Sequence, residues 1–132
     1  MPQNIFIFGH SRGGWSTLYF AAKNKKHKLG GHIIFAPAIC GPRPLSCINV
    51  INKHISLFKS SQIDGILFSH KKDRFFRPEE HKFAKEVQGL KLRTNFCEGL
   101  STKKAHFFYS KNCSYELLEE VKEFISKRSN PK

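Results

Sequence analysis

Apolar residues occur in short runs along the chain, and the spacing of these runs predicts strands. Residues 32–36 form a continuous apolar run, which is typical of a strand buried on both faces of a parallel sheet. Residues 4–8 and 63–68 are also mostly apolar and predict two further strands. Residues 92–97 form a fourth, more polar run of similar length. The pattern therefore predicts four short strands.

The segments between these runs predict helices. A first helix is expected to end near Ala22, before a basic run, and residues 47–58 carry apolar side chains at near-helical spacing. Another helix is expected from Pro78 to about Gln88, because proline and acidic residues favour a helix start. Residues 115–125 have one apolar face. This alternation predicts an α/β fold with about four parallel strands and helices on both faces.

The first predicted strand runs directly into a Gly-x-Ser-x-Gly motif with Ser11 at its centre. In this motif the serine occupies a sharp turn between a strand and a helix. We expect Gly9 and Gly13 to be required, because a side chain at either position would strike the neighbouring strand or helix. Neither common glycine pattern of a phosphate-binding loop is present. A nucleophile elbow is the favoured interpretation, and a glycine-rich turn with a solvated serine is the alternative.

An acid and a histidine follow two later strands. Asp73 comes after the third predicted strand, and His106 comes after the fourth. Because the carboxyl ends of parallel strands meet at one edge of a sheet, both residues should lie near Ser11. The chain order is therefore nucleophile, acid, histidine.

Other residues compete for these roles. Asp64 lies at the start of the third predicted strand, which places it at the opposite end of the sheet. His70 precedes the acid, and His81 lies inside the following helix. His54 has no partner motif, and His10 is expected to pack beside the turn. These positions favour Asp73 and His106 over the alternatives.

Taken together, the motifs resemble the C-terminal half of the α/β-hydrolase superfamily, particularly small hydrolases of the dienelactone-hydrolase or esterase type. The segments that carry the resemblance are residues 9–14, 69–73 and 99–107. The resemblance implies a serine hydrolase that acts on carboxylic ester or related acyl bonds through an acyl-enzyme, without a cofactor or a metal.

The resemblance also implies a role for each site residue. Ser11 would be the nucleophile, His106 the general base, and Asp73 the carboxylate that orients the imidazole. One oxyanion-hole donor would be the backbone N–H of Arg12. The other comes, in the family, from a loop in the N-terminal half of the fold.

By the same resemblance, residues 1–132 would form one domain that is truncated at its N-terminus and lacks half of the sheet. The first strand would then be an exposed apolar edge, and a second chain or a second copy is an expected partner that covers it. There are two alternatives to an active serine hydrolase: a catalytically impaired fragment, or a non-catalytic binding module of the same fold.

The net charge is +13, from 23 basic and 10 acidic residues, which suggests affinity for anions. An anionic ester or thioester substrate is one hypothesis, and cations that simply face solvent are the alternative. Nucleic-acid binding is disfavoured because the aromatic residues fall mostly in predicted strands and helices. The basic residues that flank the candidate site in sequence are Arg12, Lys71, Lys72, Arg74, Arg77, Lys103 and Lys104.

Cysteine spacing and hydropathy bear on the cellular location. Cys40, Cys47, Cys97 and Cys113 form no C-x-x-C pair, so we expect reduced, mostly buried thiols and no zinc or redox site. No apolar run approaches the roughly 20 residues that cross a bilayer. The start of the sequence does not resemble a secretory signal. These features predict a cytoplasmic protein without a membrane partner.

Overall fold

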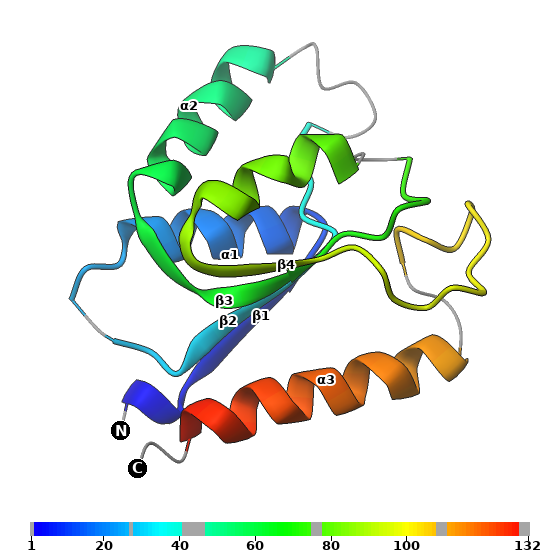
Figure 1. The fold of residues 1–132 in the computed structure, drawn as a ribbon. Coiled ribbons are helices and arrows are strands. Elements are labelled where there is room, and N and C mark those ends of the chain that lie inside the picture. The colour runs from blue at the N-terminus through cyan, green and yellow to red at the C-terminus, as the bar shows by residue number, and fades with distance from the viewer. Residues whose placement is uncertain (1, 27, 41–46, 75–77, 108–110, 130–132) are drawn as a thin grey trace.

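A computed structural model describes residues 2–26, 28–40, 47–74, 78–107 and 111–129, which form a sheet with helices on both faces (Figure 1). The strands are β1 (Phe6–His10), β2 (Gly31–Phe35), β3 (Gln62–Phe68) and β4 (Gln88–Arg93). The α-helices are α1 (Arg12–Lys23), α2 (Ile48–Lys59) and α3 (Lys111–Ser129). The described residues also form the 3-10 helices η1 (Pro2–Asn4) and η3 (Pro78–Glu86).

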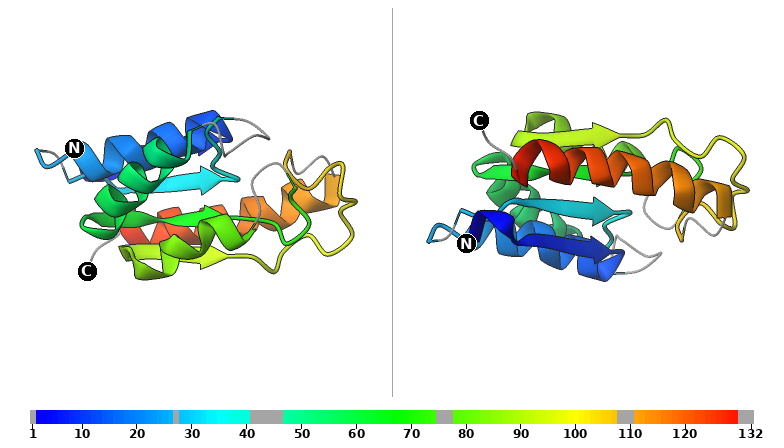
Figure 2. Two further views of the ribbon diagram at one scale, coloured as in Figure 1. Left: turned by 90° about the horizontal axis from the view of Figure 1, so that it is seen from above. Right: turned by 90° about the horizontal axis from the view of Figure 1, so that it is seen from below.

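The four strands form one parallel sheet in the order β1-β2-β3-β4. In the register, Phe8 lies opposite Ile33, and Ile33 lies opposite Ile66. The predicted α/β class and the four parallel strands are therefore confirmed. Strand β1 is an edge strand, and the view from below shows it outside the area that α3 covers (Figure 2).

Two hydrophobic clusters lie on the two faces of the sheet. Alternation along β2 and β3 sends Ile34 and Leu67 into a cluster with α1, α2 and η3. It sends Ile33 and Ile66 into a second cluster with the buried face of α3. Helices on both faces, as predicted, therefore cover strands that are apolar on both sides.

Strand boundaries differ from the predictions at both ends of the sheet. The first strand was expected at residues 4–8 but is Phe6–His10, because residues 2–4 form a 3-10 turn. The fourth was expected at residues 92–97 but is Gln88–Arg93. Gly89, with a φ of 89°, packs closely against the backbone of β3 and lets the strand begin early.

Two helices also differ from the predictions. The segment from Pro78 to Glu86 is a 3-10 helix rather than an ordinary helix that continues to Gln88. A 3-10 helix rises about 2.0 Å per residue instead of 1.5 Å, so fewer residues reach the start of β4. Helix α3 includes the predicted residues 115–125 but extends over Lys111–Ser129.

The prediction of four reduced thiols is wrong. Cys40 is disulfide-bonded to Cys47, and Cys97 to Cys113, with Cα–Cα distances of 6.4 Å and 5.0 Å. The second pair joins the loop after β4 to α3, and only the tertiary packing brings these residues together. Disulfides are more typical of oxidising compartments than of the cytoplasm, so the cytoplasmic location stays a prediction. Among the described residues, no helix has both the length and the hydropathy to cross a membrane.

Candidate active site

Ser11 lies at the junction between β1 and α1, with a φ of 56° and a ψ of −119°. A positive φ at a residue with a side chain typically costs about 1–3 kcal/mol. The N–H of Ser11 donates to the carbonyl of Phe35 at 2.9 Å. Its carbonyl accepts from the N–H groups of Trp15 at 3.0 Å and Ala38 at 2.9 Å. These bonds hold the strained strand-to-helix turn that a nucleophile elbow requires.

Only one of the two motif glycines has the role that was expected. A Cβ at Gly9 would overlap the carbonyl oxygen of Gly13 and the hydroxyl of Thr17, so the expectation for Gly9 is met. At Gly13, outside its chain neighbours and the backbone of its own helix, no atom of the described residues lies within 4 Å of the position that a Cβ would take, so the expectation for this residue is wrong. The close approach occurs one residue later, where a Cβ at Gly14 would lie 3.1 Å from the carbonyl oxygen of Phe35.

The structure brings the side chains of Ser11, Asp73 and His106 together. The Oγ of Ser11 lies 3.0 Å from Nε2 of His106, and Nδ1 of His106 lies 2.7 Å from Oδ2 of Asp73. Because a carboxylate only accepts, Nδ1 carries the proton, and Nε2 is left to accept from the serine hydroxyl. The side chains of His106 and Asp73 are 4% and 0% exposed. Both distances are within hydrogen-bonding range, and the distance between Ser11 and His106 allows a proton to pass between these two groups.

Arg12 is the first residue of α1, directly after Ser11. The first four N–H groups of an α-helix have no carbonyl partner within the helix. The backbone N–H of Arg12 therefore has no carbonyl partner within α1 and lies at the positive end of the helix dipole, one residue after Ser11.

The rival residues lie elsewhere or have other partners. Asp64 lies within β3 near the opposite end of the sheet, where its carboxylate faces Arg128 at 4.0 Å. His54 accepts a hydrogen bond from the indole N–H of Trp15 at 2.9 Å, and burial lowers its pKa. Trp15 itself is 3% exposed and packs within the first cluster.

His10 contacts the candidate site although it was expected only to pack beside the turn. Its Nε2–H donates to the backbone carbonyl of His106 at 2.7 Å, and the two rings lie 5.3 Å apart. The ring of Phe107 lies 5.7 Å from that of His10. His10 thus ties the histidine segment to the end of β1. Its position next to Ser11 was the only sequence signal for this contact.

His81 lies in η3 and packs behind the site. Its Nε2–H donates to the carbonyl of Pro37 at 2.6 Å, and its Nδ1 accepts from the hydroxyl of Ser69. Burial lowers the pKa of His81 to about 4, although the bond to Pro37 and the charge of Asp73 act in the opposite direction. The imidazole is therefore neutral at pH 7 and joins η3 to the segments after β2 and β3.

This shift predicts that acid weakens the fold. Unfolding restores the ordinary pKa of 6.5, so the unfolded chain binds the proton first as the pH falls. The contribution of neutral His81 is complete above pH 6.5 and is lost as the pH falls to about 4, a decrease of about 3 kcal/mol in the free energy of unfolding. Urea unfolding at several pH values measures this decrease in the free energy of unfolding. His81→Gln, which keeps an amide donor, should show a shallower decline; an equal decline would contradict this assignment.

Six of the basic residues near the site are described, and Arg77 lies outside the described residues. Lys71 pairs with Glu98 at 2.7 Å, and Nζ of Lys72 donates to the carbonyl of Leu100 at 2.9 Å. The other side chains are exposed: Arg12, Arg74, Lys103 and Lys104. Two of the lysines therefore have partners on the loop after β4, and four cations face solvent on segments that flank the site.

No protein-family model matches the sequence, and no curated protein matches it. The fold, in contrast, is of a known class: it is an α/β fold similar to that of a solved esterase. Among solved structures it is similar to an esterase from Pyrococcus furiosus, with a TM-score of 0.62 and 14% sequence identity. The match covers 96% of this chain and 54% of the esterase chain, so this chain spans about half the length of that protein.

Proposed function

We propose that this chain is a serine hydrolase that cleaves carboxylic ester or related acyl bonds. The observation that carries the proposal is the continuous pair of hydrogen bonds from Ser11 through His106 to Asp73, 3.0 Å and 2.7 Å long. The fold likeness to an esterase supports the same class of reaction. Neither the spacing of the motif nor the fold alone would carry it, since one fold serves many activities.

In the proposed reaction, the Oγ of Ser11 attacks the acyl carbon while its proton passes to Nε2 of His106. Asp73 holds the imidazole and stabilises the imidazolium that forms. The N–H of Arg12 donates to the oxyanion of the tetrahedral intermediate. The imidazolium then protonates the leaving alcohol or thiol, and a water molecule, deprotonated by His106, hydrolyses the acyl-enzyme.

The substrate class we propose is an anionic acyl compound. The exposed cations at Arg12, Arg74, Lys103 and Lys104 lie on the segments that carry or follow the three site residues. Charges on converging loops attract an oppositely charged substrate and raise its rate of association. This attraction is screened by salt, which distinguishes it from shape selection.

Hydrolysis of matched p-nitrophenyl esters tests both parts of the proposal. The chain should hydrolyse an ester with an acidic acyl group faster than its neutral analogue, and added salt should reduce the difference. Ser11→Ala should hydrolyse both only at the background rate. Equal turnover of both esters would exclude the anionic substrate. Turnover that is unchanged in Ser11→Ala would contradict Ser11 as the nucleophile, and a parent chain without turnover would favour a non-catalytic module.

We further propose that the β1 edge is completed by an upstream α/β segment that adds a parallel strand. Ile5 directly precedes the edge strand β1, and Phe8 lies within it; these two residues are 53% and 54% exposed. An apolar groove of about 380 Å³ runs from Phe8 along α3, where Leu118 is 47% exposed. Long apolar edges without a cover are uncommon in stable proteins. The partial coverage of the esterase chain supports an occupant of the same fold.

A further inference from the structure

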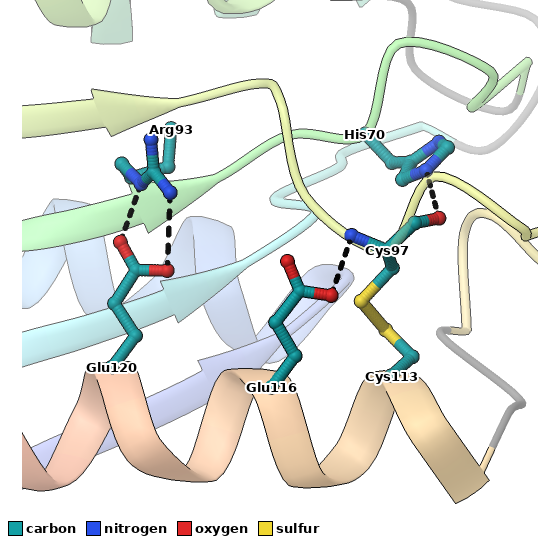
Figure 3. The surroundings of a disulfide bond; sticks show 6 residues. All are labelled: His70, Arg93, Cys97, Cys113, Glu116 and Glu120. Atoms are coloured by element: carbon teal, nitrogen blue, oxygen red, sulfur yellow. Dashed lines mark hydrogen bonds and ion pairs between the residues drawn. A yellow bond between two sulfur atoms is a disulfide. The ribbon is translucent and has the colours of Figure 1, made fainter.

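Two loops carry the acid and the histidine of the proposed triad. We call residues 69–74 the acid loop and residues 94–107 the histidine loop; they follow β3 and β4. The bond between Asp73 and His106 is their direct link in the triad. A second link lies at Cys97, where His70 of the acid loop contacts the histidine loop (Figure 3).

His70 bonds to both loops through its ring nitrogens. Its Nδ1 accepts from the backbone N–H of Lys72 at 3.1 Å, within the acid loop. The other nitrogen, Nε2, must therefore carry the proton, and it donates to the carbonyl of Cys97 at 3.2 Å. His70 is 0% exposed, and its ring packs edge-on against Phe96 at 5.2 Å. Both ring nitrogens of His70 are therefore hydrogen-bonded.

Cys97 is held from several directions. Its backbone has a φ of 49°, and its N–H donates to the carboxylate of Glu116 at 2.9 Å. Its side chain is disulfide-bonded to Cys113, so both this bond and Glu116 anchor it to α3 (Figure 3). Cys97 and Cys113 are 5% and 2% exposed. The same helix also contacts the end of β4 through the ion pair between Glu120 and Arg93.

We propose that His70 and the Cys97–Cys113 disulfide are positioning residues that set the placement of His106 against Asp73. The inference rests on the proposed function for its catalytic meaning. The disulfide connects residues 97 and 113, and this span of the chain contains His106. The disulfide holds Cys97, near the start of the histidine loop, against α3. His70 holds the same residue, Cys97, against the acid loop. Asp73 lies three residues beyond His70, with its N–H bonded to the carbonyl of His70 at 2.9 Å.

The physical reason is the cost of leaving buried polar groups unpaired. Loss of the imidazole would leave the carbonyl of Cys97 and the N–H of Lys72 without these partners, so the loops would shift to recover hydrogen bonds. Misplacement of a catalytic group by about 1 Å can cost about 10²-fold in rate. A modest shift of either loop would therefore be visible in the reactivity of Ser11.

The test measures two properties of the oxidised, full-length chain at a temperature well below its unfolding. One is the downfield NMR resonance of the His106 Nδ1 proton, which reports its bond to Asp73 without any turnover. The other is the rate at which a fluorophosphonate labels Ser11. The variants are His70→Leu, which loses both hydrogen bonds, and His70→Gln, whose amide keeps a donor. A Cys97→Ala/Cys113→Ala pair is matched by a Cys40→Ala/Cys47→Ala pair, which removes the disulfide outside both loops.

We expect His70→Leu and the Cys97→Ala/Cys113→Ala pair to broaden or abolish the resonance and to slow labelling about 10–100-fold. His70→Gln and the Cys40→Ala/Cys47→Ala pair should retain the resonance. An unchanged resonance in His70→Leu, or equal loss in the two disulfide variants, would overturn the proposal. A wild-type chain that shows the resonance but is not labelled would overturn the hydrolase assignment alone, since the positioning is read from the resonance.

Discussion

Replacement of Asp73 by asparagine is expected to slow ester hydrolysis by about 10⁴-fold, if Asp73 fixes the tautomer of the catalytic histidine. In the structure its carboxylate accepts from Nδ1 of His106 at 2.7 Å and is fully buried. An amide in its place can donate to Nδ1, which would move the proton to Nε2. His106 could then no longer accept the proton of Ser11. The initial rate on a p-nitrophenyl ester measures the loss.

Asp64→Asn is the matched control, because Asp64 is the other acid of the third-strand region and lies near the opposite end of β3. Its carboxylate interacts with Gln62 at 3.2 Å and with Arg128 at 4.0 Å. The rate of Asp64→Asn should stay within about twofold of the parent rate, because surface ion pairs contribute little. A larger loss in Asp64→Asn than in Asp73→Asn would contradict the assignment of the acid.

A supplied upstream α/β half should raise turnover by about 10²–10³-fold and increase the soluble yield. The rate effect is the size expected when an oxyanion hole gains its second donor beside the N–H of Arg12. The gain in solubility should come from covering the apolar edge at β1, where Phe8 is 54% exposed. Co-expression of the chain with such a segment, followed by co-purification and an esterase assay, measures both.

Phe8→Lys provides a control for the role of the edge. A lysine on an exposed edge strand opposes pairing with another strand, and this position faces solvent in the chain alone. The variant should stay folded but lose co-purification and the gain in turnover. If co-expression changes neither yield nor turnover of the parent chain, the proposed completion of the sheet is wrong.

Local patterns were sufficient to predict the architecture. The apolar runs at residues 32–36 and 63–68 are strands because a sheet covered on both faces requires apolar side chains in both directions. The order of Ser11, Asp73 and His106 predicted their meeting point, because parallel strands place their carboxyl ends at one edge. The distances between these side chains in the structure agree with that expectation.

Features that depend on packing between distant segments could not be predicted. The bond from His70 to Cys97 joins residues 27 positions apart, and nothing in the spacing marks it. The Cys97–Cys113 disulfide forms because α3 lies below the end of β4 (Figure 3). The absence of a C-x-x-C motif therefore could not show whether these cysteines are bonded. The start of β4 depends on the close packing of Gly89 against Ile63 rather than on hydrophobicity.

Fluorophosphonate labelling tests the central claim most directly, since the reagent reacts rapidly with an activated serine and not with ordinary serines. Intact-mass analysis should show one adduct per chain, and peptide mapping should place it on Ser11. Ser11→Ala should abolish it, whereas Ser16→Ala, which changes an exposed serine of α1, should leave it unchanged. An unlabelled wild-type chain, or an adduct that persists in Ser11→Ala, would contradict the account.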